Sequence, residues 1–403
     1  MHTTTWRTIR EAVTHHPGAL YCADGLHRSR HWLQAEEGRV SPDQFYIWSS
    51  GILASCYAIP HTAVHRTYAT WEILCGAPIE HLIQRAPQPQ RESASAELAS
   101  VRARLSAEAT DTLAVVTPGC VFPGITLPQD VDSDALHTLA RQVEVQAREL
   151  GLPVVEFGNV RDDTAAGQVL HKTLQTRGYT AVTVGADAIL DTSPYANLDA
   201  YFASFRAHRR NVLRRERRLF LDTHPTVRVD GPDGLTADLA SLQLDRYRRY
   251  GHEADTGAVH DRFARAARIP GLKVLRADAV AQPPSATAPQ PLGFIAFYED
   301  RRTHRILTRL GAFGDRSAAV YFNIAYYELL SHAVQVGGMR IHYGDSTYLA
   351  KTLRGCELAR LTSYFRADDD VLHNVLTQAG RLRTALEEQQ LTQTTEGGSP
   401  VES

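Results

Sequence analysis

Titratable side chains gather near the carboxyl-terminal end of the chain, in a stretch that begins at Glu328. Glu328 lies in a helix-like pattern, and His342 lies in the strand-like pattern that follows it. Asp345 and Lys351 come next, in a polar segment. An imidazole near neutral pH can take the proton that leaves an amine, and a lysine cation can stabilise a developing oxyanion. We therefore expect Glu328, His342, Asp345 and Lys351 to serve as acid–base and electrostatic groups of a catalytic site.

Each assignment competes with a second interpretation. Strand alternation places His342 on the face opposite Ile341 and Tyr343, so that His342 points either into a cleft or to solvent. Lys351 is one of only three lysines in the chain, yet it can also be an ordinary surface residue. Asp345 follows a strand on a loop, which suits the binding of a cationic acceptor amine.

Three tyrosines and one arginine of the same stretch complete the candidate site. We expect Tyr327, Tyr343 and Tyr348 to line the acceptor pocket, with packing of their rings in the core as the alternative. Arg354 suits a phosphate of the donor because its planar guanidinium can make two parallel hydrogen bonds, whereas a structural ion pair would use the same group.

An arginine-rich helical pattern lies upstream, with seven arginines from Arg206 to Arg218 and Glu216 as the only acid among them. Its periodicity predicts an exposed stripe of Arg206, Arg210, Arg214 and either Arg217 or Arg218. The opposite, buried side is expected to hold Phe202, Phe205, Val212, Leu213, Leu219 and Phe220. Like charges at this spacing repel each other by roughly 0.2–0.5 kcal/mol per pair, so we expect a partner that offsets the repulsion.

Phosphate groups would offset the charge of this arginine stripe. We expect Arg206, Arg210 and Arg214 to bind the donor through its phosphates, with a salt-dependent affinity if the donor is an RNA. Two alternatives stay open. One is a set of ion pairs with acids of a neighbouring domain, such as Asp368–Asp370, and the other is plain exposure to solvent.

The elements around these residues follow a helix–glycine–strand order. Apolar residues recur every three or four positions from Val320 to Val334, which predicts a helix with one apolar face. Gly337 and Gly338 end this helix because glycine tolerates the left-handed conformation of a C-cap. The alternating pattern of Met339–Tyr343 then predicts a strand.

Strands and helices alternate through the rest of the chain as well. Strands are expected at Gln44–Trp48, Leu53–Ile59, Thr67–Trp71, Leu113–Thr117, Val154–Phe157, Thr180–Leu190, Val227–Val229, Lys273–Arg276, Leu292–Tyr298 and Ile306–Leu310. Helices are expected at Asp134–Leu150, Thr164–Arg177, Asn197–Phe220, Asp238–Tyr250, His260–Arg268 and from Asp368 to about Gln390. This order predicts an α/β fold with a mixed sheet, and its repetition predicts two tandem domains, 1–190 and 191–390, followed by a disordered tail, 391–403.

Composition is that of an ordinary globular protein. The chain has 403 residues, 43% of them hydrophobic, and a net charge of -2, and its length favours two domains. It contains no apolar run of about 18 residues and no apolar secretory core at its start, so we expect a cytoplasmic protein. Its five cysteines are scattered without CxxC spacing, so we expect neither a metal site nor disulfides.

Two segments together carry a resemblance to a known family. They are the arginine-rich stretch Leu198–Arg217 and the Tyr326-Tyr327 helix with the Lys351 and Arg354-Gly355 segment that follows it. With these segments the chain resembles the FemAB-like, tandem-GNAT acyltransferases of the peptidoglycan biosynthesis or recognition type. The resemblance covers roughly Pro118 to Arg366 and is better in the second half.

The resemblance implies two GNAT-like domains, of which the second carries the acyl-transfer cleft. Fem-type relatives take an aminoacyl group from a charged tRNA, whereas GNAT enzymes proper take acetyl from coenzyme A. GNAT proteins bind the pyrophosphate with a glycine-rich turn before a helix. The corresponding turn here, Arg309–Arg316, spaces its glycines differently and carries the acid Asp315, which favours aminoacyl-tRNA over acyl-coenzyme A.

The expected function is therefore amide bond formation, with an aminoacyl group from aminoacyl-tRNA as the donor. The acceptor would be the amine of a small molecule or peptide, such as a natural-product or cell-wall precursor. We expect no bound cofactor, because the donor is a co-substrate. The first alternative is an acyl-coenzyme A-dependent N-acetyltransferase, and the second is a binding module that keeps the fold without the chemistry.

Overall fold

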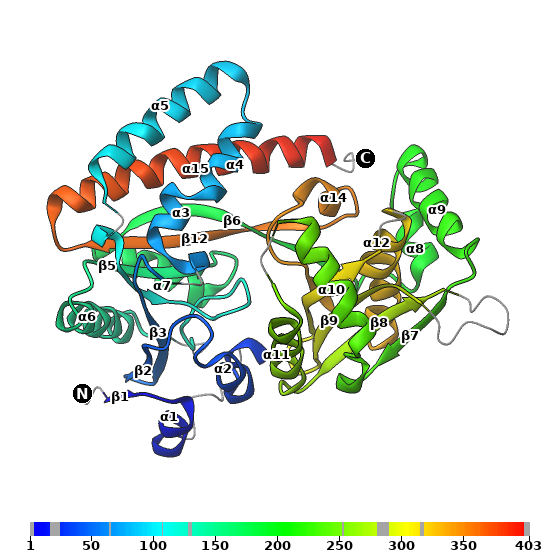
Figure 1. Cartoon of the computed structure of the whole chain (residues 1–403), viewed down its shortest axis with the longest axis horizontal. Helices are drawn as coiled ribbons and strands as arrows, with labels where there is room; N and C mark the ends of the chain where they lie inside the picture. Colours follow the sequence, from blue (N-terminus) through cyan, green and yellow to red (C-terminus); the bar gives the residue numbers. More distant parts are fainter. Residues whose placement is uncertain are drawn as a thin grey trace. The chain divides into compact units, whose positions relative to one another are not determined.

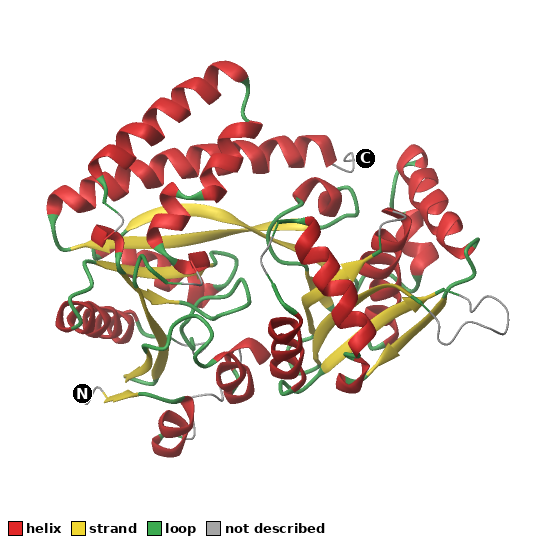
Figure 2. Ribbon diagram, viewed as in Figure 1, coloured by secondary structure: helices red, strands yellow, loops and turns green. Residues whose placement is uncertain are grey.

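The computed structural model describes residues 4–16, 25–63, 66–106, 108–127, 131–251, 254–279, 290–314 and 318–398. These residues form two compact units. The first unit contains the described residues up to Ala188, together with Gly344–Thr352 and Leu358–Gly398. The second contains those of Ile189–Tyr343 and Leu353–Glu357. Figure 1 and Figure 2 show strands with helices packed against them in each unit, which confirms the expected α/β class.

The first unit is built on seven strands in the order β1-β2-β3-β4-β5-β12-β6. They are β1 (Thr4–Trp6), β2 (Gln44–Ser49), β3 (Ile52–Ile59), β4 (Thr112–Val115), β5 (Val154–Val160), β12 (Glu357–Ala367) and β6 (Thr180–Asp191). Neighbours are antiparallel from β1 to β4, and β12 is antiparallel to β5. β4 and β5 run parallel, so this sheet is mixed.

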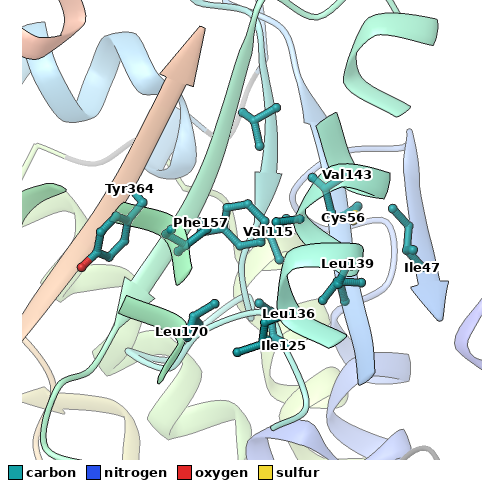
Figure 3. Close-up of a cluster of buried hydrophobic side chains, with 14 of the residues drawn as sticks. Ile47, Cys56, Val115, Ile125, Leu136, Leu139, Val143, Phe157, Leu170 and Tyr364 are labelled. Atoms are coloured by element: carbon teal, nitrogen blue, oxygen red, sulfur yellow. The ribbon is translucent and has the colours of Figure 1, made fainter. Parts of the chain in front are cut away.

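Helices cover both faces of this sheet. They are α1 (Ile9–His15), α2 (Arg30–Glu36), α3 (Thr70–Cys75), α4 (Ala77–Arg85), α5 (Gln88–Arg104), α6 (Ser133–Glu149), α7 (Ala165–Thr176), α14 (Tyr348–Thr352) and α15 (Asp370–Gly398). Alternation along β5 explains the two layers: Val155 and Phe157 face α6 and α7, whereas Val154 faces α3, α4, α5 and α15. Figure 3 shows the first cluster, where Leu139 of α6 and Leu170 of α7 pack around Phe157.

The second unit has a sheet in the order β11-β10-β9-β8-β7, extended beside β11 by the last residues of β6. Its strands are β7 (Thr226–Asp230), β8 (Leu272–Asp278), β9 (Pro291–Asp300), β10 (Arg305–Phe313) and β11 (Arg340–His342). Its helices are α8 (Leu198–Ala203), α9 (Ala207–Leu221), α10 (Ala237–Arg249), α11 (Thr256–Ala267), α12 (Ala318–Phe322), a π-helical turn (Asn323–Glu328) and α13 (Leu329–Gln335). β10 and β11 run parallel, and the other described pairs are antiparallel.

The two halves of the chain repeat one order of elements. The first half runs β1, α1, α2, β2, β3, β4, α6, β5, α7 and β6, with α3, α4 and α5 inserted before β4. The second half runs β7, α10, α11, β8, β9, β10, the helical segment 318–335, β11, α14 and β12. In both halves the fourth strand is parallel to the fifth. The tandem arrangement expected from the sequence is thus present as a repeated topology.

The last strands of the two halves are exchanged. β12 pairs with β5 of the first half, and the end of β6 pairs with β11 of the second half. The expected boundary near residue 190 therefore lies close to the point where the chain leaves the first unit, after Ala188. The expected assignment of 191–390 to one domain does not hold, because Leu358–Gly398 packs in the first unit through β12 and α15.

Three local expectations also differ from the structure. Thr67–Trp71 is helical rather than a strand, because α3 begins at Thr70 and buries Leu74 below the sheet. The expected helix Asn197–Phe220 is divided into α8 and α9, since Arg206 has an extended backbone that starts the second helix. α15 continues to Gly398, so 391–398 is not a disordered tail, and 399–403 lies outside the described residues.

A carboxylic acid lies inside the first unit. Glu156 is only 1% exposed and stands in β5 opposite Ala114 of β4 and Phe365 of β12. Burial raises the pKa of Glu156 from 4.5 to about 8, although the Ser363 hydrogen bond and the Arg383 charge lower it. The carboxyl is therefore protonated at neutral pH in the folded protein and ionised in the unfolded chain.

This difference predicts a pH-dependent effect of Glu156→Gln on stability. Between about pH 4.5 and 8 the Glu156 carboxyl is protonated in the folded protein but ionised in the unfolded chain. Unfolding therefore releases a proton in this range, and the free energy of unfolding of the wild type falls as the pH rises. The variant lacks this penalty and should gain stability over the wild type by about 1.4 kcal/mol per pH unit across that window. Urea unfolding at pH 5, 6, 7 and 8 measures it. The exposed Glu108→Gln is the control, and equal slopes for both variants would contradict the prediction.

Candidate functional site

The two parallel strands of the second unit separate soon after they meet. β10 pairs with β11 through three residue pairs, which end at Leu307 and His342. The Thr308 hydroxyl donates to the His342 carbonyl oxygen over 3.0 Å, and the register of β10 against β9 shifts between Thr308 and Leu310. Among the described strands, the remainder of β10 pairs with β9 alone. Diverging strands expose backbone groups that can bind an extended chain.

The corresponding place in the first unit is filled by the unit's own chain. β4 and β5 pair through four residues, and the loop after β4 then lies against the end of β5. Side-chain hydrogen bonds fix this loop: Trp32 Nε1 to the Pro118 oxygen (3.0 Å), Gly119 N to the Tyr68 hydroxyl (2.9 Å) and Asn159 Nδ2 to the Cys120 oxygen (3.5 Å). The strand separation of the second unit is therefore the better candidate for binding a substrate.

A π-helical turn interrupts the helix that packs on β8 and β9 of the second unit. At its start, the Asn323 side-chain amide donates to the Ala319 carbonyl oxygen over 2.7 Å, which satisfies a carbonyl of the preceding turn. At its end, Glu328 forms an ion pair of 2.5 Å with Arg217 of α9. Such turns often mark functional sites, because the extra residue rotates the following side chains.

Glu216 of α9 is the centre of a buried polar network. Arg354 Nη2 donates to both carboxylate oxygens of Glu216, over 2.9 and 2.8 Å, and the Tyr327 hydroxyl donates to one of them. Arg354 is 2% exposed, and its guanidinium carbon lies 3.3 Å from the centroid of the Phe322 ring. The network fixes α9 to the π-helical turn through charge-assisted hydrogen bonds.

The opposite face of α9 carries the arginine stripe. Arg206 and Arg214 are exposed, and Arg210 is half-buried with one hydrogen bond of 3.3 Å to the Ala203 oxygen. None of the described acids of this unit pairs with these three arginines. Asp368, the alternative partner, forms ion pairs with Arg148 and Arg366 of its own unit. Leu219 was expected on the buried side but is 49% exposed, because α9 packs through Leu213 and Phe220.

The segment after β11 forms a tight loop in the first unit. Lys351 is 4% exposed, and its Nζ donates to the Gly344 and Asp345 carbonyl oxygens over 2.9 Å each. Ser346 and Thr347 follow with φ values of 69° and 48°, in the left-handed region that side chains rarely adopt. Lys351 thus holds a strained loop that presents the exposed Asp345.

A second anchor holds the other side of this loop. One carboxylate oxygen of Asp187 accepts from Gly344 N over 3.0 Å, and the other accepts from Arg161 over 2.6 Å. The Tyr348 hydroxyl accepts from Ala186 N over 2.9 Å. The loop is therefore attached to β6 by both its ends.

The structure is similar to that of several solved proteins. FemX matches with a TM-score of 0.50 and 12% sequence identity over 66% of this chain and 83% of FemX. The carboxyl-terminal domain of a lysylphosphatidylglycerol synthetase from Agrobacterium fabrum matches with a TM-score of 0.53 and 9% identity, over 90% and 95% of the two chains. L-PGS from Bacillus licheniformis matches with a TM-score of 0.52 and 11% identity, over 93% and 96%.

The chain has the fold of these proteins. At such low identities the likeness concerns the fold, and it agrees with the FemAB-like, tandem-GNAT resemblance of the sequence. No family model matches the chain, and no curated protein matches its sequence.

The structure divides the predicted site residues between the two units. In the second unit it brings together Tyr327, Glu328 and Arg354. The same unit holds His342 at the end of β11 and Tyr343 just after it, and it holds Arg206 at the N-cap of α9 and Arg210 and Arg214 within α9. In the first unit it brings together Asp345, Tyr348 and Lys351. The chain passes from one unit to the other between Tyr343 and Gly344, which separates residues that are close in the sequence.

Burial decides between several of the alternatives. His342 is 5% exposed, so the expectation that it could point to solvent is wrong. Arg354 forms the structural ion pair with Glu216, and Lys351 is buried rather than a surface residue. The Tyr343 ring lies 4.8 Å from that of Tyr326, and burial raises the pKa of the Tyr343 hydroxyl. The catalytic and binding roles of all these residues stay predictions.

Sequence reasoning missed several members of these two networks. Glu216 left a signal, because it is the only acid among the arginines of α9. Asp187 and Arg161 left none, because strand and loop positions far apart in the sequence become neighbours only in the folded unit. The segment Arg309–Arg316 was compared with the glycine-rich turn that binds a pyrophosphate. Its Gly311 lies within β10, and its Asp315 lies outside the described residues.

Two further expectations concern the whole chain. Within the described ranges, no helix combines the length and the apolar character that a membrane span needs. No group of three or more His, Cys, Asp or Glu side chains suited to a metal ion is found among those residues either.

The buried ion pair predicts a large coupling between Arg354 and Glu216. Arg354→Met should destabilise the protein by about 3–5 kcal/mol, because it leaves Glu216 without its ion-pair partner. Glu216→Gln in the same background should recover part of that loss, so the double variant costs less than the sum of the single variants.

Urea unfolding of the four proteins measures this coupling. The exposed pair Arg340 and Asp191, whose side chains are 64% and 39% exposed, is the control and should show about 0–1 kcal/mol. Strict additivity of Arg354→Met and Glu216→Gln would contradict the prediction.

Proposed function

We propose that the protein is an acyltransferase that forms an amide bond between an aminoacyl group and the amine of a small molecule or peptide. The donor in this proposal is aminoacyl-tRNA, and the protein acts in the cytoplasm. The amine nitrogen attacks the ester carbonyl, the new C–N bond forms as the ester C–O bond breaks, and the amine proton passes to the leaving ribose hydroxyl. No redox partner is needed for this step.

The observation that supports this donor is the arginine stripe of α9. Arg206 and Arg214 are exposed and Arg210 is half-buried, and none of the three pairs with an acid among the described residues of their unit. The other face of α9 is fixed by Glu216 to Arg354. A row of guanidinium groups without acidic partners there is suited to the phosphates of an RNA backbone. The FemAB-like resemblance of the sequence implies such a donor, and the fold shared with FemX agrees with that resemblance.

The candidate catalytic groups follow from the same geometry. Tyr327 and Glu328 lie on the π-helical turn, and His342 lies where β10 and β11 separate, so a donor bound along that separation would lie near them. His342 is the proposed base, and backbone groups of β10 would hold the carbonyl oxygen. Asp345 and Tyr348, on the loop held by Lys351, are the proposed contacts of the acceptor.

Acyl-coenzyme A is the second candidate donor, because one specific feature favours it. The separation of β10 from β11 exposes strand edges that suit an extended donor with amide groups, and such a donor would need no arginine stripe. A binding module without catalysis remains the third interpretation.

A donor screen distinguishes these functions. The purified full chain is incubated with an amine mixture and either labelled charged tRNAs or labelled acyl-coenzymes A, and loss of label from the donor is measured. We expect loss from charged tRNA that ribonuclease abolishes. Loss from acyl-coenzyme A alone would identify the second function, and no loss from either donor would favour the binding module.

The arginine stripe predicts a salt-dependent affinity for tRNA. Arg210→Glu with Arg214→Glu should weaken tRNA binding and lower the slope of log K against log salt by about two, because each lost phosphate contact removes about one unit. Filter binding at 50–200 mM salt measures the slope.

The matched control for this experiment is Arg301→Glu with Arg340→Glu, which changes the same charge on two exposed arginines of the same unit. We expect the control to keep the wild-type slope. An equal fall in both double variants would show a general charge effect and would contradict a binding role for α9.

A further inference from the structure

A glutamine of the second unit is completely buried and has no hydrogen-bond partner. Gln243 of α10 is 0% exposed, and neither its Oε1 nor its Nε2 has a partner among the described residues. Because both atoms lack a partner, this finding does not depend on which way the amide is turned. Buried side-chain amides are normally hydrogen-bonded, and an unpaired one reduces stability. Such an amide is completed by a group that offers both a donor and an acceptor.

The neighbours of Gln243 on α10 define the direction of its side chain. Arg246 Nη1 donates to the Gly311 carbonyl oxygen of β10 over 2.8 Å, and the Tyr247 hydroxyl accepts from Arg262 of α11. Around the helix axis Gln243 lies between Arg246 and Tyr247, about 60° from the first and about 40° from the second. Since α10 packs against β9 and β10, Gln243 points toward these strands.

Arg246 marks the edge of β10 that is open beyond its pairing with β11. Gly314 N donates to the Leu292 carbonyl oxygen of β9 over 2.9 Å. In an antiparallel pair every second residue bonds to the partner strand, so Gly311, three positions before Gly314, points its N–H and C=O away from β9. Arg246 therefore reaches the edge where β10 and β11 have separated, and Gln243 lies one helical turn before Arg246.

An aminoacyl group has both of the functions that would complete the Gln243 amide. Its α-ammonium group donates hydrogen bonds, and its ester carbonyl oxygen accepts them. One carbon atom separates the amine from the carbonyl, so both can meet a single carboxamide. A plain acyl group such as acetyl supplies the carbonyl oxygen alone and would leave Oε1 of Gln243 unpaired.

We propose that Gln243 binds the aminoacyl group of the donor, with Oε1 accepting from the α-ammonium group and Nε2 donating to the ester carbonyl oxygen. Rotation about the three side-chain torsions of Gln243 turns the amide toward a ligand at the β10 edge while α10 stays in place. Gln243 is then a specificity residue that favours an aminoacyl over a plain acyl group. This inference rests on the proposed function, which supplies the identity of the donor.

Binding of puromycin to the full chain tests the inference. Puromycin carries an aminoacyl group on the 3′ position of an adenosine through a stable amide, and N-acetylpuromycin differs only in its blocked α-amino group. Calorimetry at pH 6.5, where an α-amino group is protonated, measures both affinities. We expect puromycin to bind about tenfold more tightly, because it alone offers an ammonium to Oε1. Equal affinities, or no binding of either compound, would overturn the proposal.

Gln243→Met then assigns the preference to this residue, because it keeps the length of the side chain and removes the amide. The variant should bind puromycin and N-acetylpuromycin equally, and its urea midpoint should rise because an unpaired buried amide is gone. The control Gln335→Met makes the same change at an exposed residue of α13 and should keep the wild-type preference and midpoint. A lower midpoint of Gln243→Met with an unchanged preference would show a structural amide and overturn the assignment.

The result is separable from that of the donor screen. If the preference for puromycin depends on Gln243 but no labelled donor is consumed, the binding role of Gln243 stands and the acyltransferase proposal fails. If charged tRNA is consumed but the wild type binds puromycin and N-acetylpuromycin equally, the acyltransferase proposal stands and the role of Gln243 fails.

Discussion

The exchange of terminal strands is the constraint on which the rest of the structure depends. Because β12 must reach β5, the chain between Tyr343 and Leu358 contributes to both units, with Gly344–Thr352 in the first and Leu353–Glu357 in the second. In each unit a buried cation holds the part of this segment that belongs to it. Lys351 binds two loop carbonyls on one side, and Arg354 binds Glu216 on the other. A short segment of the chain thereby carries the groups that hold both candidate sites.

Two of the buried charged side chains that hold the backbone, one in each unit, have partners of opposite charge. Arg354 meets a carboxylate and the Phe322 ring, and Asp187 meets Arg161, so these groups are satisfied and serve to hold backbone. Arg206 and Arg214, by contrast, are exposed and pair with none of the described acids of their unit. Water solvates such exposed cations, so they need no protein partner for stability and stay accessible to an anionic ligand.

The two halves share a topology but differ at the point where their parallel strands separate. In the first unit the loop after β4 is tied down by Trp32, Tyr68 and Asn159. In the second unit β10 and β11 diverge beside a π-helical turn. The two halves of this repeated fold thus differ at the corresponding point: one is closed by its own chain, whereas the parallel strands of the other diverge.

The sequence by itself determined what short-range patterns encode. Alternation and helical periodicity predicted α6, β5, β6 and the strands of the second unit, because burial of one face imposes a period on neighbouring residues. They also predicted that Arg206, Arg214 and Arg218 are exposed, whereas Arg210, expected in the same stripe, is half-buried. Only the tertiary structure decided the strand exchange, the contacts of Lys351 with its loop and the pairing of Glu216 with Arg354. These contacts join residues far apart in the chain or across a change of unit, and no local period records which distant backbone or charge a side chain will meet.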